Sequence, residues 1–199
     1  MVRGLLQRWC WDGGVGGGAA KAPRPLPAVR LEPLSEASDP RLLASVLALK
    51  PGPGQDRYCL PASMTYPPAS ADALRVPFAV MAQLPGPGSG ERVVGFGTLD
   101  RRGHLEHLLD DPARGLLLRA FYIGRPHQGR GYGTAAARQA RALAHALEPE
   151  ADLLVLCVHE SNAAARTAYA RAGFADSGAR WMAQAADPQV VMVAALQPR

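Results

Sequence analysis

The chain has 199 residues, of which 48% are hydrophobic and 20% charged, and its net charge is +5. This length suits one domain, and the balance of residues excludes a wholly disordered or a fibrous chain. No run of about 18 apolar residues occurs, which excludes a membrane-spanning helix.

The cysteines indicate the redox environment of the protein, and the arginines indicate what kind of ligand its charge suits. Cys10, Cys59 and Cys157 are odd in number and far apart, which fits neither a disulfide framework nor zinc-ligand spacing. We therefore expect a reducing, cytoplasmic setting. Only Lys21 and Lys50 are lysines, so the other 20 of the 22 basic residues are arginines, scattered without aromatic interleaving. We expect no nucleic-acid partner, and an anionic cofactor is a better match for the charge.

The beginning of the chain differs in composition from the rest. Gly13–Ala20 is rich in Gly and Ala, and prolines alternate with other residues over 22–27. The apolar stretches here are too short for a secretory signal. The sequence therefore predicts a flexible N-terminal tail over residues 1–27, followed by one domain over 28–199.

The domain begins with patterns typical of a strand and a helix. Apolar and polar residues alternate over Val29–Leu34, which predicts a strand. Asp39 ahead of Pro40 is typical of a helix start, and the apolar face that follows extends to Leu49. The run Pro51–Gly54 ends that helix.

The next segment is less regular and leads into a hairpin. Residues 55–74 predict a short helix or a loop, with breaks at Pro61 and at Pro67–Pro68. Phe78–Gln83 and Val93–Leu99 read as two strands on either side of a turn rich in Pro, Gly and Ser.

In the second half, strands and helices alternate. Leu116–Ile123 is an uninterrupted apolar run, typical of a buried central strand, and a glycine-rich turn and a helix over about 134–147 follow it. Leu153–Val158 is a second such run. The remaining predicted elements are a helix over 162–172 that ends at Gly173, an extended segment from Phe174, and a last strand over Val190–Leu196. This order predicts a mixed α/β fold.

The most informative stretch is Gln128–Gly133, between the apolar run and the helix. At such a junction the first amide N–H groups of the helix have no acceptor within the helix and point outward. Glycines let the backbone approach an anion, and the helix dipole favours negative charge there. The loop therefore predicts a pyrophosphate site, with an ordinary turn as the alternative. It is not a P-loop, because the lysine is absent, and no acidic residue is placed as a dinucleotide fold requires.

Two motifs stand in a recognisable order. The first is the strand, loop and helix around Gln128-Gly-Arg-Gly-Tyr-Gly133. The second follows the strand Leu153–Val158 and consists of Asn162, Tyr169 and Gly173-Phe174. Together they resemble the GNAT superfamily of acetyl-CoA-dependent N-acetyltransferases, over about residues 29–196. The resemblance implies a mostly antiparallel central sheet of about six to seven strands, flanked by about four helices.

Segments of the front half also resemble bacterial spermine/spermidine acetyltransferases, although they are not catalytic. These segments are Leu47–Lys50, Gln55–Tyr58, Pro77–Val80 and Val94–Gly97. Gln189 departs from that pattern, in which a Glu is expected before the last strand.

The resemblance implies roles for the residues of both motifs. The backbone amides of the loop would bind the cofactor pyrophosphate; these residues are Gln128, Gly129, Arg130, Gly131, Tyr132, Gly133 and Thr134. The main chain of Phe121, Tyr122 and Ile123 would pair with the pantetheine arm, and Asn162 would contact that arm. Tyr169 would be the general acid that protonates the departing thiolate, since a phenol has a suitable pKa. A tyrosine that merely anchors the core is the alternative.

No general base is evident in the sequence. Arg119 is the only charged residue of Leu116–Ile123. Three acids precede this strand, and they would either reach the acceptor or form a solvated loop; they are Glu106, Asp110 and Asp111. His104 and His107 lie among them, but the chemistry needs no metal, and we expect none.

The predicted activity is transfer of an acetyl group from acetyl-CoA to a primary amine. We expect direct transfer to a small, polyamine-like molecule. Within the enzyme class the alternatives are a protein or peptide amine and an aminoglycoside. A non-catalytic sensor that only binds acyl-CoA is the alternative from another class. The resemblance also makes a homodimer an expectation, which the residues themselves do not indicate.

Overall fold

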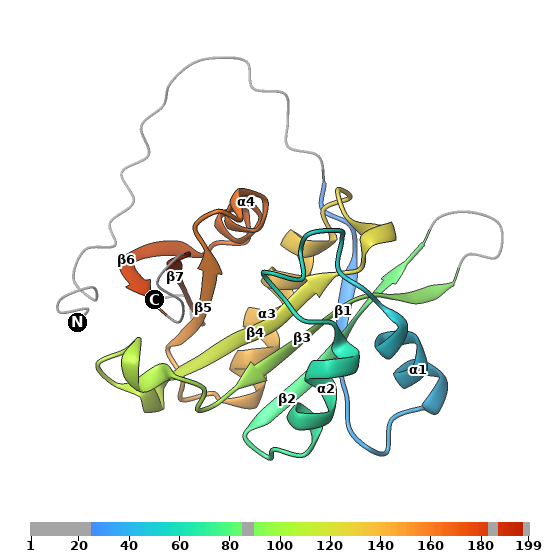
Figure 1. Ribbon diagram of the computed structural model, residues 1–199. Helices are drawn as coiled ribbons and strands as arrows, with labels where there is room; N and C mark the ends of the chain where they lie inside the picture. The colour runs from blue at the N-terminus through green and yellow to red at the C-terminus, as the bar shows by residue number, and fades with distance from the viewer. Residues whose placement is uncertain (1–24, 85–89, 183–186, 197–199) are drawn as a thin grey trace.

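The computed structural model describes residues 25–84, 90–182 and 187–196. Their strands form one mostly antiparallel sheet of seven strands, which confirms the predicted sheet, in the order β1-β2-β3-β4-β5-β7-β6 (Figure 1). The pair β4–β5 is parallel and the other five pairs are antiparallel. Residues 1–24 of the predicted tail lie outside the described residues. Within the described ranges, every helix is too short or too polar to cross a bilayer.

The elements confirm the predicted order, with bounds that differ by a few residues. The strands are β1 Val29–Pro33, β2 Arg75–Gln83, β3 Glu91–Asp100, β4 Gly115–Ile123, β5 Leu153–His159, β6 Ala175–Trp181 and β7 Gln189–Ala195. The helices are α1 Pro40–Ala48, α2 Ala62–Ser70, α3 Tyr132–Leu147 and α4 Ala163–Arg171. The short 3₁₀ turns of the described residues are η2 Leu105–His107, η3 Pro112–Arg114 and η4 Arg125–His127.

The helices cover both faces of the sheet, with α1 and α2 in front of it and α3 behind it (Figure 1). Because side chains alternate along a strand, neighbouring residues of β2 serve different cores. Phe78 and Val80 pack with the buried alanines of α3, whereas Ala79 and Met81 pack with Val46 of α1 and the α2 residues. Small alanine side chains on α3 allow its backbone to lie close to the sheet.

The helix α2 corrects one prediction. Pro67 and Pro68 were expected to interrupt any helix in this segment, but both lie inside this nine-residue helix. Each proline already has a helical φ, and its cost is the lost N–H donor. Tyr66 and Ala69, which flank the prolines, are buried, and their packing against the sheet compensates for that loss.

The most consequential feature of the sheet is the short pairing of its two parallel strands. β4 and β5 pair only through Gly115–Leu117 and Leu153–Val155, at the start of each strand. Beyond these residues the two strands separate, so that a gap opens toward their carboxyl ends. Ligands of open α/β sheets bind outside such carboxyl ends.

Candidate active site

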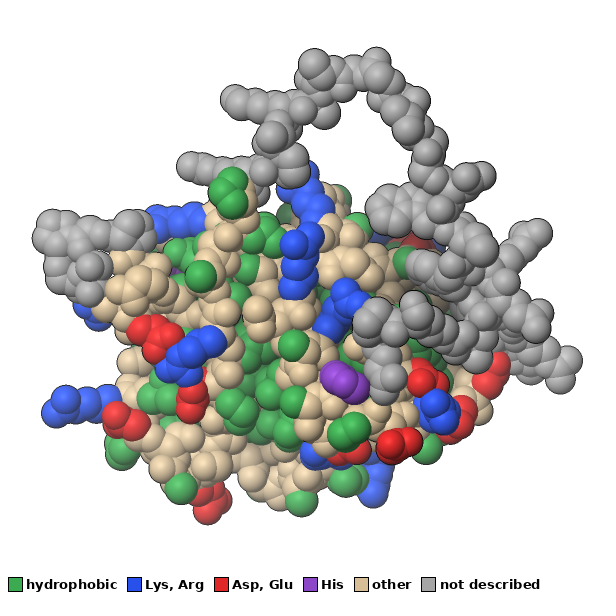
Figure 2. Space-filling view, turned by 180° about the vertical axis from the view of Figure 1, so that it is seen from behind, with side chains coloured by type: hydrophobic (Ala, Val, Ile, Leu, Met, Phe, Trp, Pro, Cys, Tyr) green, Lys and Arg blue, Asp and Glu red, His purple; other side chains and the backbone are tan. Residues whose placement is uncertain are grey.

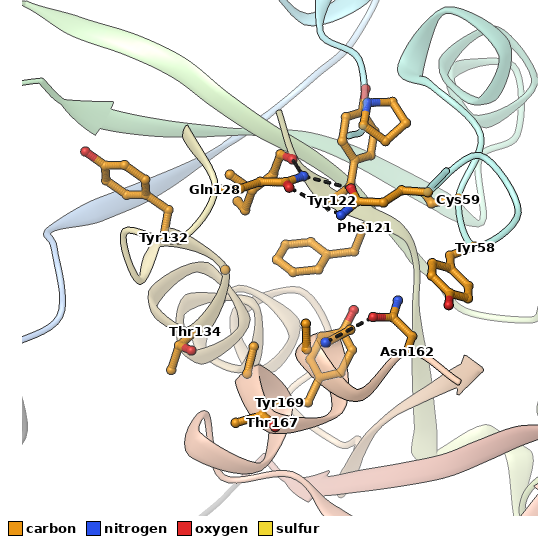
Figure 3. A pocket seen from close by; sticks show the side chains of 18 of the residues that line it. Tyr58, Cys59, Phe121, Tyr122, Gln128, Tyr132, Thr134, Asn162, Thr167 and Tyr169 are labelled. Atoms are coloured by element: carbon orange, nitrogen blue, oxygen red, sulfur yellow. Dashed lines mark hydrogen bonds between the residues drawn. The ribbon is translucent and has the colours of Figure 1, made fainter. Parts of the chain in front are cut away.

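A cavity of about 400 Å³ lies at the gap between β4 and β5 (Figure 3). All of the predicted site residues except Arg130, which is exposed, line this cavity. The rest of its wall comes from α4 and from the segment before α2. In Figure 3, Tyr132 lies at one end of the cavity and Tyr58 at the other, with Phe121 and Tyr169 between them.

The glycine loop has the backbone geometry of an anion site. Gly129 and Gly131 have φ values of 73° and 86°, a left-handed conformation that favours glycine. Gly131 is the N-cap of the 16-residue helix α3. Within the described residues, the amide N–H groups from Gly129 to Thr134 have no backbone acceptor. The loop therefore presents free donors at the positive end of a helix dipole, which suits a phosphate.

The Gln128 side chain holds this loop against the end of β4. Its Nε2 donates to the carbonyl of Ile123 and to Oε1 of Gln55, at 2.8 Å in each case. The Gln55 Oε1 also accepts from the N–H of Gly52 at 2.8 Å. The amide of Gln128 is thus engaged within the protein. Only its main chain is left for a ligand.

A bulge redirects the side chains at the end of β4. Ala120 has a φ of 49°, which is strained for a residue with a Cβ, and the pairing with β3 shifts at this point. As a result the ring of Phe121 joins the core on the α3 side, while Tyr122 joins the core on the α1 side. The strand edge that faces β5 has no strand partner after Leu117, so the main chain near Phe121 is open to the gap.

The hydroxyl of Tyr122 has a structural role. It accepts from the N–H of Ala62 at 3.0 Å and donates to the carbonyl of Leu49 at 2.9 Å. Burial raises the pKa of this phenol. The side chain of Tyr122 therefore ties the ends of α1 and α2 to β4, and its contribution to the cavity is confined to its wall and main chain.

Tyr169 projects from α4 into the middle of the cavity (Figure 3). Its ring packs against Phe121 and Phe174, with centroids 6.1 Å and 5.9 Å away. No residue of the described chain forms a hydrogen bond with its hydroxyl. Burial raises the pKa of this phenol well above its usual range, so the hydroxyl keeps its proton at neutral pH.

Asn162 caps the same helix and faces the cavity. Its Oδ1 accepts from the N–H of Ala165 at 3.2 Å, which stabilises the first turn of α4. That bond fixes the orientation of the amide, and the Nδ2 group makes no hydrogen bond with the described residues. The residue therefore combines a structural bond with a free donor.

The charge around the cavity is neutral to basic. None of the residues that line the cavity is acidic, and one of the lining residues, Arg171, is basic. Arg138 of α3 donates to the carbonyl of Arg171 at 2.7 Å, and neither arginine forms an ion pair with a described carboxylate. Seen from behind, Lys and Arg side chains gather in a column across the middle of the surface (Figure 2). His127 also lines the cavity, and burial together with nearby Arg130 lowers its pKa.

The predicted acids lie at the other end of β4. They precede Gly115, where the strand begins, whereas the cavity lies beyond Phe121, near its end. Asp111 caps η3 by accepting from Ala113 at 3.2 Å, and Asp110 is exposed, as is Glu106. The structure thus supports the solvated-loop interpretation and places no acid from this cluster at the cavity.

The two histidines of that loop stack on an aromatic ring. The His104 and His107 rings lie 4.5 Å and 5.5 Å from the Trp181 ring, centroid to centroid. Among the described residues, no group of three or more His, Cys, Asp or Glu could hold a metal ion.

The cavity also contains residues that the sequence did not assign to the site, among them Gln55 and Tyr58. Tyr58 belongs to the segment before α2, and its ring lies 5.5 Å from that of His159 at the end of β5. Both belong to the segment Gln55–Tyr58 that resembles spermine/spermidine acetyltransferases, but that pattern does not place them at a site, because their partners are more than 70 positions away in the chain.

A loop with free amide N–H groups beside a gap between two parallel strands suits a phosphorylated ligand. The model of the acetyltransferase (GNAT) family matches residues 73–174, about half of the chain. The chain belongs to this family and is an acetyl-CoA-dependent N-acetyltransferase. A comparison with curated proteins finds no significant match.

Solved structures share the fold at low sequence identity. One is AAC(6')-Ib in complex with paromomycin and acetyl-CoA, with a TM-score of 0.62 and 19% identity over 84% of this chain and 93% of that chain. Another is spermidine N-acetyltransferase from Vibrio cholerae in complex with CoA and spermine, with a TM-score of 0.58 and 16% identity. That match covers 84% of this chain and 95% of the other.

Proposed function

We propose that this enzyme transfers an acetyl group from acetyl-CoA directly to a primary amine of a small, polyamine-like molecule. The observation that carries the proposal is the position of the cavity, which is lined from both sides of the sheet. Tyr58 and Cys59 enter from the α1–α2 side, and Asn162 and Tyr169 enter from the α4 side. Two substrates that approach from opposite faces would meet in the gap, and such positioning supplies a large part of the rate enhancement.

In this proposal the cofactor lies on the side of α3 and α4. The free amides from Gly129 to Thr134 would hold its pyrophosphate, with Arg171 nearby for further negative charge. The open main chain near Phe121 would pair with the pantetheine arm, and Asn162 Nδ2 would donate to it. The absence of carboxylates from the cavity lining supports this placement of a polyanion.

Tyr169 would protonate the departing thiolate. Its hydroxyl points into the cavity, lacks a protein partner among the described residues and retains its proton at neutral pH because burial raises its pKa. A thiolate that forms beside this hydroxyl would accept its proton, because no described residue competes for it by a hydrogen bond. This acid role is what separates the enzyme from a sensor that only binds acyl-CoA.

The acceptor would approach from the α1–α2 side, past Tyr58. Asp187, whose side chain is 32% exposed, is linked to Tyr58 through Ser161. Its carboxylate would attract a polycationic amine. An aminoglycoside is the second candidate, because AAC(6')-Ib has the same fold and its structure holds one.

The proposal is tested by release of free thiol from acetyl-CoA against a panel of polyamines, aminoglycosides, amino acids and short peptides. We expect the fastest release with spermidine or spermine. Fastest release with another member of the panel would contradict the polyamine-like acceptor and support a transferase that acts on a different class of amine. Silence across the panel, with acetyl-CoA binding retained in calorimetry, would favour the sensor. No binding at all would refute the cofactor site.

A further inference from the structure

We propose that His159 is the proton acceptor that deprotonates the amine substrate, and that Asp187 positions it. The inference rests on the proposed function and supplies the general base that no sequence pattern indicates. It depends on the place of His159 in the sheet, on its bond to Asp187 and on its contact with Tyr58. Each of these is independent of the glycine loop.

The register of the sheet places His159 at the gap. Leu117 of β4 pairs with Val155 of β5, and both strands run on in the same direction from there. β5 runs on for four residues beyond Val155 to His159, its last residue, so His159 lies at the carboxyl end of β5, past the point where the pairing with β4 ends. Phe121 begins the main chain proposed to hold the acetyl-bearing arm.

The alternation of side chains along β5 places the imidazole on the side of the acceptor. Leu154, Leu156 and Val158 pack with α3, whereas Val155 and Cys157 pack on the opposite face. His159 follows the second set. Its ring contacts Tyr58, which belongs to the α1–α2 side, at 5.5 Å between centroids. The cofactor and this imidazole therefore lie on different faces of the sheet, and the gap between them is where transfer would occur.

The bond to Asp187 sets the tautomer of the imidazole. The Nδ1 atom of His159 lies 2.9 Å from Oδ2 of Asp187. A carboxylate can only accept, so Nδ1 carries the hydrogen and, in the neutral ring, Nε2 carries the lone pair. Within the described chain Nε2 has no hydrogen-bond partner. The side chain of His159 is 14% exposed, and it adjoins the cavity through the ring of Tyr58, which lines it.

The remaining groups around the imidazole form one hydrogen-bonded network. Ser161 Oγ lies 3.0 Å from Asp187 Oδ2 and 3.2 Å from the Tyr58 hydroxyl. Arg57 donates to the same hydroxyl at 2.6 Å. Arg57 is thus one step removed from the imidazole, and Asp187 is the charged group in direct contact with it. The adjacent Glu160 pairs instead with Arg180 of β6, and Gln189 is the neutral neighbour on β7.

The Nε2 of neutral His159 takes one proton from the substrate ammonium. The resulting amine nitrogen forms a bond to the thioester carbonyl carbon, and the carbon–sulfur bond breaks. Tyr169 gives its proton to the sulfur. The nitrogen loses a second proton as the amide forms, which restores the phenol through water, while the proton on His159 leaves to solvent.

The test compares pH–rate profiles of three single variants with that of the wild-type protein. The substrate is spermidine, or the amine with the fastest release in the panel. His159→Gln removes the proton acceptor. Asp187→Asn keeps the imidazole but removes the carboxylate that orients it. His107→Gln is the matched control on η2, where the side chain is 57% exposed. Calorimetry with CoA and thermal unfolding are recorded for each variant.

We expect His159→Gln to lower kcat/KM at pH 7 on the order of 10²-fold, with CoA affinity unchanged. The loss should shrink as the pH approaches the pKa of the amine, because the substrate then arrives deprotonated. Asp187→Asn should give a smaller loss in kcat, and His107→Gln should match the wild type.

A His159→Gln profile that keeps the wild-type shape would overturn the inference, whatever its height, since a purely structural residue changes the rate uniformly with pH. The inference would also be overturned if His159→Gln lost activity only where its unfolding temperature was lowered as well. Either result leaves the wild-type transferase intact. The proposed function itself fails in a different way, through silence of the wild-type protein with every amine.

Discussion

Gln55 and Gln128 are 73 residues apart in the chain, yet their side-chain amides exchange two hydrogen bonds, of 2.8 Å and 3.2 Å. This pair joins the segment before α2 to the glycine loop. Both residues line the cavity. The loop that is proposed to bind pyrophosphate is therefore held in place from the opposite side of the sheet.

Gln55→Ala should weaken CoA binding by about five- to tenfold, because loss of about 1 to 1.5 kcal/mol of hydrogen bonding frees the loop. Calorimetry with CoA measures the effect. Gln139→Ala, at an exposed position of α3, is the control and should bind as the wild type does. Equal affinity in both variants would show that the amide pair does not position the loop.

Tyr169→Phe should lower kcat on the order of 10²-fold and leave the CoA affinity nearly unchanged, because only the proton donor is lost. Because burial raises the pKa of this phenol, the wild-type rate should not decline through deprotonation of Tyr169 at pH 8 to 9. Tyr66→Phe removes a hydroxyl that binds the carbonyl of Ser35, away from the cavity, and serves as the control. A wild-type kcat in Tyr169→Phe would contradict the acid role.

Gly131→Ala should raise the dissociation constant for CoA roughly tenfold. The residue has a φ of 86°, which costs an L residue about 1–2 kcal/mol, and its new Cβ would lie 3.1 Å from Pro27. Gly178→Ala imposes the same kind of strain at a φ of 81° on β6, with no atom within 4 Å of the new Cβ. The two variants should lose similar stability in urea unfolding, and only the first should lose CoA affinity. A parallel loss of affinity in both would indicate a global effect.

Asp100→Asn should destabilise the fold by about 1–3 kcal/mol at pH 7, because the partly exposed Arg75 and Arg119 would lose charge-assisted hydrogen bonds to a carboxylate that is 1% exposed. Burial opposes ionisation of Asp100, but the N–H groups of Arg102 and Gly103 and the Arg119 guanidinium outweigh it, so its pKa lies below the usual value.

A lowered pKa contributes stability that is present above the unfolded value, about 3.9, and that is lost as the pH falls through the folded value. The difference between wild type and Asp100→Asn should therefore shrink below about pH 4. Urea unfolding at pH 7 and pH 3 measures it, with the exposed Asp110→Asn as the control. A difference that is the same at both pH values would show that the charge of Asp100 is not the stabilising element.

The sequence by itself determined most of the elements and the position of the glycine loop. The runs Leu116–Ile123 and Leu153–Val158 are apolar enough to be buried strands, and Asp39 with Pro40 marks a helix start. Gly129 and Gly131 indicate a turn with left-handed backbone before a helix. These signals are local, because strand alternation, helix capping and glycine conformations depend on residues a few positions apart. For the same reason the two GNAT motifs could be found in the chain without a structure.

Only the tertiary structure decided what surrounds that loop. The early end of the β4–β5 pairing, the bulge at Ala120 and the side on which Tyr122 packs follow from competition between whole strands and helices for the same space. The same holds for the contact between Gln55 and Gln128 and for the bond between His159 and Asp187. Each of these contacts joins segments that the chain order keeps apart, so no window of sequence contains both partners. Their energy comes from packing and from desolvated hydrogen bonds, which exist only once the sheet has formed.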